Sequence, residues 1–537
     1  MSGRKLSLPK KVAEMGVPAW NSQGSVRHVL QILDQACQAS TVEEALEEVR
    51  GFESLGHLIW SYAYLRMLHY KDSDLFYRLL LAEPSFLMPI VYTPTVGEAC
   101  QKFGTLPVLP RGCYVSLTDR GNVRAVLKEY ADAMLPKGAD GKPECQCIVF
   151  SDGGRILGLG DLGVWGMGIP IGKLDLYTVC GGFDPNKTIP VIIDAGCDDF
   201  APHTNTAKPK QAIRDHPLYH GLKQERVKHT AKGTQVNSAY YGEESLIGEF
   251  MTASRDLFGQ GCLLQFEDFN TNDAFPLLAE YRDRFLTYND DIQGTASVTV
   301  AAVLGGIKLQ NPSATNLLEE LRGLRVLFHG AGSANLGSAQ LIISAAKMPK
   351  AQVLVTNSRG VIWASESGGT YRNEQQKFVA QEGEPKGYDH TDLVSIIKHH
   401  KPDILVGAVG RAPNCFTQVN NFFIFPGMSF GAVCCEATTI PDELFMTAAE
   451  AVAHSLDEDD RKSESVLPCT ARIREVGLKV ATAVVLAAQE AGLARKKLGS
   501  TEEEVAKALR ALRWEPGAKE VKPKADVAPL RLRGSRI

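Results

Sequence analysis

The chain has 537 residues, of which 44% are hydrophobic and 22% are charged, and its formal net charge is −4. This is the composition of a soluble globular protein, and at roughly 100–200 residues per domain it predicts about two to four domains. The slightly acidic balance excludes a globally basic nucleic-acid binder, and the absence of an apolar run approaching about 18–20 residues argues against a membrane protein.

The first residues are basic but contain no apolar segment, so they do not form a secretory signal. Few arginines occur there and Pro9 would interrupt a helix, which favours a cytoplasmic location over import into mitochondria or plastids. From about 25 to 90, apolar residues such as Leu30, Leu33, Leu46 and Val49 recur at helical spacing and predict several helices. The 12 cysteines lack disulfide or zinc spacing and are interpreted as reduced thiols.

Short buried runs then alternate with helical segments, which predicts an α/β fold. The expected strands are 147–150, 190–194, 262–264, 325–328, 352–355 and 403–406, and an apolar helix is expected at 298–309. We expect a domain at 1–293 with helices followed by an α/β region, and a Rossmann-like NAD(P)-binding domain at 294–494. A basic C-terminal helix and tail follows at 495–537.

Two glycine patterns could bind a dinucleotide. The pattern at 330–337 directly follows an expected strand, and a helix is expected at 339–346, whereas the pattern at 158–163 is interpreted as a loop that approaches the substrate. A pyrophosphate requires free backbone N–H groups and no obstructing side chain. The predicted cofactor-binding residues are therefore those of the second loop and the polar end of the next strand, namely Gly330, Gly332, Ser333, Ala334 and Asn357.

Two pairs of acidic residues follow apolar runs, Glu267 with Asp268 and Asp290 with Asp291. Each pair alone is more often a solvated loop, but bulky apolar neighbours favour a site, and clustered carboxylates suit Mg²⁺ or Mn²⁺. Lys173 lies in the apolar stretch 168–174, where partial desolvation would lower its pKa and allow it to act as a base. A lysine whose amine extends to solvent is an equally good interpretation.

These blocks together resemble the malic enzymes over roughly residues 60 to 490. The matching segments are 76–78, 91–97 (Val-Tyr-Thr-Pro-Thr-Val-Gly), 151–163, 166–173, 265–269 and 289–295. The resemblance implies oxidative decarboxylation of L-malate to pyruvate and CO₂ with NAD or NADP and Mg²⁺ or Mn²⁺. It also implies a homodimer or homotetramer.

The resemblance assigns roles to single residues. Glu267, Asp268 and Asp291 would hold the metal ion. Arg155 and Asn421 would bind the substrate, with the guanidinium of Arg155 on a carboxylate. Lys173, assisted by Asp290, would take the hydroxyl proton, and Tyr92, which from its sequence surroundings alone is better explained as a core aromatic, would protonate C3 of enolpyruvate.

The chain also departs from the family pattern. After Thr417 it lacks about fifty residues that family members carry, including a Ser-Asn-Pro-Thr block, so the dinucleotide domain is expected to be truncated to about four strands where six are usual. Gly154 replaces a usual Glu, and Val419 replaces a usual Gly. A catalytically impaired relative that acts as a binding or oligomer subunit is therefore an alternative, as is a 2-hydroxy-acid dehydrogenase that does not decarboxylate.

The choice of cofactor rests on three positions. Asn357 stands where a carboxylate usually binds the ribose hydroxyls, and Arg359 is close enough to meet a 2′-phosphate. Against this, Gln375 stands where NADP-preferring relatives carry Lys. These features favour NADP slightly over NAD.

Overall fold

The computed structural model describes residues 38–54, 58–106, 111–198, 213–227, 240–242, 244–363, 375, 378, 386–407 and 419–517. Five helices open this part of the chain: α3 (Val42–Glu53), α4 (Leu58–Lys71), α5 (Ser73–Ala82), α6 (Pro84–Val91) and α7 (Thr95–Gln101). Thr41 caps α3 and Asp72 caps α5 through side chains that accept backbone N–H bonds. The helices predicted up to residue 90 are confirmed where the structure describes them, and residues 25–37 lie outside it.

The first sheet has five parallel strands in the order β1-β3-β2-β4-β5. Their bounds are Cys113–Ser116 (β1), Cys147–Ser151 (β2), Thr188–Asp194 (β3), Leu263–Phe266 (β4) and Thr287–Asn289 (β5). Every residue of β2 to β5 is buried, which explains why β2, β3 and β4 appear in the sequence as largely apolar runs.

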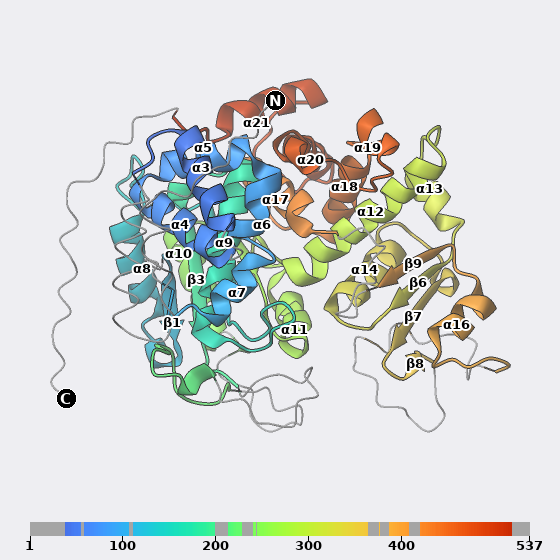
Figure 1. Cartoon of the computed structure of the whole chain (residues 1–537), viewed down its shortest axis with the longest axis horizontal. Helices are drawn as coiled ribbons and strands as arrows, with labels where there is room; N and C mark the ends of the chain where they lie inside the picture. Colours follow the sequence, from blue (N-terminus) through green and yellow to red (C-terminus); the bar gives the residue numbers. More distant parts are fainter. Residues whose placement is uncertain are drawn as a thin grey trace.

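Helices cover both faces of this sheet (Figure 1). Ile148 and Phe150 share a core with α8 (Val123–Met134), α10 (Leu246–Phe258) and α11 (Thr271–Tyr281), whereas Cys147 and Val149 share one with α9 (Gly168–Leu176). The alternation of side chains along a strand produces this division. The carboxyl ends of β2, β4 and β5 lie at one edge, where the expected acidic residues follow.

The second sheet has four strands in the order β8-β7-β6-β9, and only β8 runs antiparallel to its neighbour. The bounds are Val326–His329 (β6), Val353–Asn357 (β7), Gly360–Val361 (β8) and Ile404–Gly407 (β9), with helices α13 (Leu317–Arg322), α14 (Ser333–Ser344) and α16 (Leu393–His400). The expected strands and the α/β class with a Rossmann-like part are confirmed. The helix expected at 339–346 instead begins at Ser333, because the chain turns into helix directly after Gly332.

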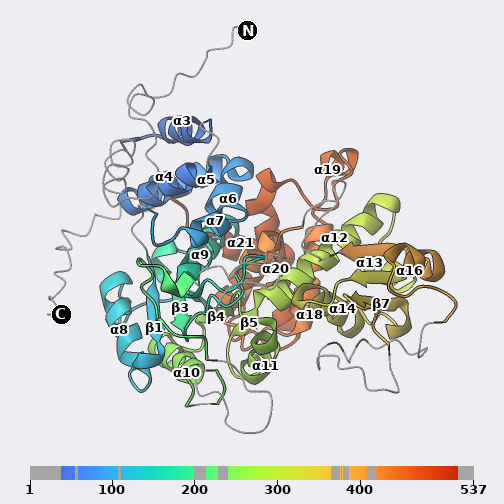
Figure 2. The same cartoon turned by 60° about the horizontal axis from the view of Figure 1, so that its bottom comes forward.

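A long helical segment joins the two sheets. The π-helical turn η6 (Asp290–Gly294) continues into α12 (Thr295–Gln310), which packs against α14 and α18 (Asp442–Ala453) (Figures 1 and 2). By length and composition Asp290–Gln310 could cross a membrane, so the expectation that no such run exists is wrong. However, 67% of its most apolar window is buried in the protein, as in the core helix of a globular fold.

The C-terminal helices return to the first sheet. Helices α17 (Phe425–Cys434) and α20 (Ile473–Glu490) pack against the π-helical turn η3 (Tyr177–Gly181). The remaining elements are α19 (Glu458–Lys462), α21 (Glu502–Leu512), η1 (Leu117–Asp119), η2 (Gly163–Met167), η4 (Pro185–Lys187), η5 (Ile213–Asp215), η7 (Lys350–Gln352), η8 (Asn421–Phe423) and η9 (Thr470–Arg472). The domain limits given above stay predictions, and the basic tail beyond 517 lies outside the described residues.

Candidate active site

The two predicted acidic pairs meet at the carboxyl edge of the first sheet. Glu267 and Asp268 directly follow β4, and Asp291 lies in η6. One oxygen from each of these three carboxylates lies within 4.8 Å of the others. The backbone N–H of Asp268 donates to Asp291 Oδ2 over 2.7 Å, and Asp268 adopts a left-handed φ of 56°. The solvated-loop interpretation is therefore wrong, since Glu267 and Asp268 are buried.

This cluster fits a divalent cation. Burial raises the pKa of both Glu267 and Asp268 well above the usual range, and the neighbouring Asp291 carboxylate raises them further. Asp268 Oδ2 is buried and has no hydrogen-bond partner among the described residues. Buried carboxylates are stabilised when a hard cation takes their oxygens, so the donor set suits Mg²⁺ or Mn²⁺.

Lys173 projects from α9 into the same cluster. Its side chain is fully buried, its Nζ donates to Asp290 Oδ2, and Glu267 Oε1 lies 3.1 Å away. The rings of Phe425 and Tyr92 lie 4.2 and 5.2 Å from Nζ, measured to the ring centroids. The interpretation of an amine that extends to solvent is therefore wrong.

The pKa of Lys173 also differs from expectation. Burial disfavours the ammonium, but Asp290 and Glu267 outweigh burial and raise the pKa of Lys173 well above its usual value. The expected lowering is wrong because an apolar sequence neighbourhood does not reveal the carboxylates that fold against it. Asp290 has its own pKa raised to about 6 by burial, against the opposing effect of Lys173.

Tyr92 ends α6 beside this lysine. It is 5% exposed and its hydroxyl donates to Glu267 Oε1 over 3.5 Å. Burial raises the pKa of Tyr92 well above its usual value, so the phenol keeps its proton. Tyr92 is thus buried, as a core aromatic would be, and also directed at the charged cluster.

The two predicted substrate-binding residues border the cluster. The backbone N–H of Arg155 donates to Asp268 O over 3.0 Å, and its exposed side chain bonds Thr271 Oγ1. Asn421, in η8, donates its amide to Asp290 Oδ2. The structure therefore brings together all eight residues predicted for catalysis, metal and substrate.

A buried hydrogen-bond chain behind Glu267 was not predicted. Gln265 Nε2 donates to Glu267 Oε2 over 2.6 Å, and Gln265 Oε1 accepts from Tyr177 and Tyr288. The hydroxyl of Ser429 in α17 lies 3.0 Å from that of Tyr288. The sequence offered one indication of this hydrogen-bond chain, which is the polar residue Gln265 inside an otherwise apolar strand.

The predicted dinucleotide residues lie apart from this cluster, at the carboxyl ends of β6 and β7. Gly330 has a φ of 104°, and Gly332 precedes the first turn of α14, where an added Cβ would meet no atom within 4 Å. Ser333 and Ala334 begin α14. This arrangement leaves open space at a helix N-terminus, as a pyrophosphate requires.

The end of β7 carries no acidic group in its last residues. Asn357 accepts from the N–H of Arg359 over 2.7 Å, and the side chain of Arg359 is exposed. Gln375 donates to Ala331 O over 3.2 Å and so lies against the glycine loop.

Comparison with known proteins explains why a buried carboxylate cluster and a glycine loop at a helix N-terminus occur in one chain. The malic enzyme N-terminal domain matches residues 69–282, and the malic enzyme NAD binding domain matches 292–418 and 413–489. The chain belongs to the malic enzyme family. The second match falls into two pieces that overlap at 413–418, the region where we expect a missing segment.

Curated malic enzymes match most of the chain. The NADP-dependent malic enzyme of Anas platyrhynchos is 33% identical over 505 residues, covering 81% of this chain and 82% of the relative. The human NADP-dependent malic enzyme is also 33% identical, covering 82% and 81%, and NADP-dependent malic enzyme 1 of Arabidopsis thaliana is 34% identical, covering 86% and 83%. The solved malic enzyme of Entamoeba histolytica matches with a TM-score of only 0.43 at 18% identity, covering 95% and 94%.

Proposed function

We propose that this protein oxidatively decarboxylates L-malate to pyruvate and CO₂ and reduces NADP. The observation that carries the proposal is the convergence of Lys173, Tyr92 and the carboxylates of Glu267, Asp268 and Asp291 in one buried cluster. Membership of the malic enzyme family supports oxidative decarboxylation of malate in general.

Each residue has a task in this reaction. Arg155 binds a carboxylate of malate, and Asn421 positions the substrate beside Asp290. Lys173, in the neutral form that a cation bound to the neighbouring carboxylates would favour, accepts the proton of the malate hydroxyl, with Asp290 as its hydrogen-bonded partner. Tyr92 delivers a proton to C3 after CO₂ leaves, and Lys173, close to the Tyr92 ring, returns a proton to it.

Two bound groups complete the chemistry. A divalent cation held by Glu267, Asp268 and Asp291 would polarise the substrate oxygen, and NADP at Gly330, Gly332, Ser333 and Ala334 would accept the hydride. The raised pKa of Lys173 arises from the nearby carboxylates. A cation bound to Glu267 would offset the negative charge of that carboxylate and so lower the pKa of Lys173, which would favour its role as the base.

We propose NADP rather than NAD. The neutral amide of Asn357 and the exposed guanidinium of Arg359 suit a 2′-phosphate better than a carboxylate would. Several curated relatives are named NADP-dependent. The cytoplasmic location and the homodimer or homotetramer stay predictions, and one mouse relative is named mitochondrial.

The second candidate is a folded relative with impaired catalysis. It is favoured by the segment that we expect to be missing after Thr417, near the place where the NAD-binding match divides into two pieces. A dehydrogenase without decarboxylation is less well supported, because simple hydride transfer needs neither the three-carboxylate cluster nor an acid for C3.

One assay separates these candidates. The purified protein is supplied with L-malate and Mn²⁺, with NADP or NAD, and absorbance at 340 nm is followed together with pyruvate. Reduction that a chelator abolishes, with pyruvate formed in equal amount, supports the proposal. Reduction without pyruvate would support the simple dehydrogenase. No reduction by folded protein that still binds Mn²⁺ would support the impaired relative.

A further inference from the structure

We propose that Arg226 is a positioning residue for the substrate: it fixes both ends of the loop 152–163 and thereby places Arg155. The inference rests on the proposed role of Arg155. It assigns a function to a buried arginine that makes no direct contact with the metal cluster.

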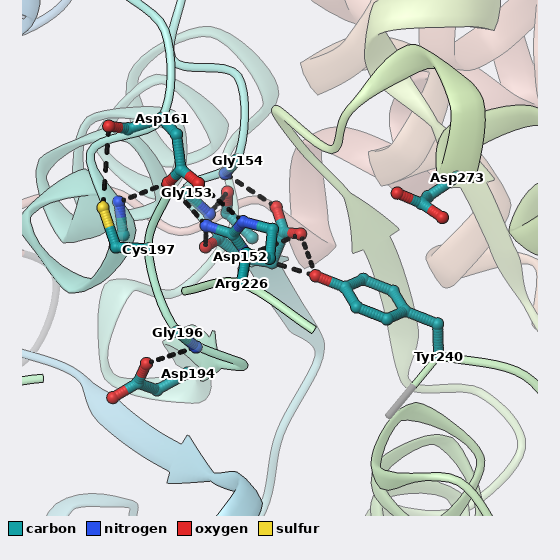
Figure 3. A network of polar contacts seen from close by, with 12 residues as sticks. Asp152, Gly153, Gly154, Asp161, Asp194, Gly196, Cys197, Arg226, Tyr240 and Asp273 are labelled. Carbon is teal, nitrogen blue, oxygen red and sulfur yellow. Dashed lines mark hydrogen bonds and ion pairs between the residues drawn. The ribbon is translucent and has the colours of Figure 1, made fainter. Parts of the chain in front are cut away.

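Arg226 binds the first end of the loop through Asp152, the residue that follows β2. Its Nη1 donates to Asp152 Oδ2 over 2.9 Å, and its Nη2 donates to the backbone oxygen of Asp152 over 2.8 Å (Figure 3). Tyr240 completes this contact, because its hydroxyl donates to the same carboxylate oxygen over 2.7 Å.

Arg226 binds the second end of the loop through Asp161. Its Nε and Nη2 donate to the two oxygens of that carboxylate over 2.7 and 2.6 Å, a bidentate arrangement that only a guanidinium can make. Asp161 also accepts from the N–H of Gly163 over 3.0 Å and from the N–H of Asp198 over 2.8 Å. One cation therefore joins two points of the chain that are nine residues apart.

The loop is closed internally as well. The N–H of Leu162 donates to Gly153 O, and the N–H of Ile156 donates to Gly160 O, each over 2.9 Å. Gly153 has a φ of 67°, and a Cβ there would lie 2.0 Å from Gly163 O, so the two ends are in direct contact.

Arg155 lies inside this closed loop. Its backbone N–H donates to Asp268 O, so the loop fixed by Arg226 is held directly against the metal cluster. Arg226 is 7% exposed and Asp152 is 1% exposed. Hydrogen bonds between charged groups that are buried away from water tolerate little change in the positions of the two groups. Displacing either loop end would move Arg155 relative to the carboxylates.

The test uses Arg226→Lys, which keeps the charge but loses the bidentate contact, and Asp161→Asn, which keeps the size but loses the charge. Lys223→Gln is the matched control, because Lys223 is an exposed cation on the same segment, three residues before Arg226. For each variant, Mn²⁺ binding is titrated by electron paramagnetic resonance, and malate binding to the Mn²⁺-loaded protein is measured by calorimetry. KM and kcat are measured with malate and NADP.

We expect Arg226→Lys to raise the Kd and KM for malate about tenfold, with kcat at saturation and Mn²⁺ affinity changed less than about threefold. Combining Arg226→Lys with Arg155→Ala should add little to the effect of Arg155→Ala alone, since both act through one side chain. Lys223→Gln should leave both malate constants unchanged.

Three results would overturn the proposal: an unchanged malate Kd in folded Arg226→Lys and Asp161→Asn, a loss of Mn²⁺ affinity equal to the loss of malate affinity, or fully additive effects with Arg155→Ala. If Arg226→Lys does not fold, Asp161→Asn, by itself and combined with Arg155→Ala, decides between these outcomes. The malate-binding measurement does not require turnover, so wild-type protein that binds malate but does not reduce NADP would refute the proposed function while still testing Arg226.

Discussion

Lys173 Nζ lies 3.1 Å from Glu267 Oε1, at a place where both side chains are withdrawn from solvent. The same ammonium donates to Asp290, so one buried cation balances two carboxylates that directly follow different strands of the first sheet, β4 and β5. This relationship connects the candidate base, the candidate metal site and Tyr92, and most of the following predictions test it.

Replacing Lys173 by Met should abolish turnover and destabilise the metal-free protein. Removing one partner of a buried ion pair costs about 3–5 kcal/mol, because the remaining charges stay buried without compensation. Added Mn²⁺ should restore part of that loss. Thermal unfolding with and without Mn²⁺ measures this, with Lys102→Met, from an exposed pair with Glu98, as control. Equal melting temperatures for wild type and Lys173→Met would contradict the expectation.

Replacing Tyr92 by Phe should lower kcat by about 10²–10⁴-fold, the usual contribution of a general acid. The ring beside Lys173 is retained, so Mn²⁺ affinity and the melting temperature should change little. Steady-state pyruvate formation measures the effect. Tyr114→Phe removes a phenol from the edge strand β1, which β3 and β2 separate from β4, and should leave kcat unchanged. A Tyr92→Phe protein with wild-type kcat would remove Tyr92 from the proton pathway.

Gln265→Leu should weaken Mn²⁺ binding about 10–100-fold, because partners that orient a metal ligand typically contribute this much. Gln265 donates to Glu267 Oε2, and Tyr288 helps to hold the amide in that orientation. Mn²⁺ titration well below the unfolding temperature tests this. Tyr288→Phe keeps Gln265 and should have a smaller effect, whereas equal effects of both variants would argue for a general packing defect.

Mn²⁺ itself should stabilise the wild-type protein by about 2.7 kcal/mol at a concentration 100 times its Kd. Asp268→Asn should reduce this stabilisation strongly, because Asp268 Oδ2 has no other partner among the described residues. Melting curves over a range of Mn²⁺ concentrations measure it. Replacing the exposed Asp140 by Asn is the control. An undiminished metal-induced shift in Asp268→Asn would place the ion elsewhere.

Arg359→Ala should raise the KM for NADP by about tenfold or more and leave the KM for NAD nearly unchanged, as expected for loss of one charged hydrogen bond to a 2′-phosphate. Steady-state kinetics with both cofactors test this. Lys398→Ala, an exposed cation in α16, controls for general charge loss. A parallel change for NADP and NAD would show that Arg359 does not distinguish them.

The sequence predicted β2, β3, β4, β6, β7 and β9, because buried parallel strands are continuous apolar runs. It missed β1, β5 and β8, which are only two to four residues long. It also placed Glu267 and Asp268 at the end of a strand, where the structure has them, whereas the strand before Asp290 and Asp291 was not expected. The roles of Tyr92, Asn421 and Arg155 came from family resemblance and not from local pattern.

What could not be predicted depends on contacts between distant positions. Lys173 and Asp290 are 117 positions apart, and Asp290 and Asn421 are 131 apart. The pKa of Lys173 was therefore misjudged from its apolar neighbours alone. Arg226 lies in a polar segment without a motif, so nothing in the sequence indicated its contact with Asp161, which is 65 positions away.

A Cβ at Gly337 would lie 2.5 Å from the backbone oxygen of Ile292, which follows Asp291 in the chain. The helix that begins at the dinucleotide loop thus touches the turn that carries two of the acidic residues, backbone against backbone. Side chains can adopt new rotamers when two surfaces slide, but main-chain atoms in contact cannot. The distance between the proposed dinucleotide loop and the proposed metal site is therefore limited by this backbone contact, and we expect a single methyl group at position 337 to change it.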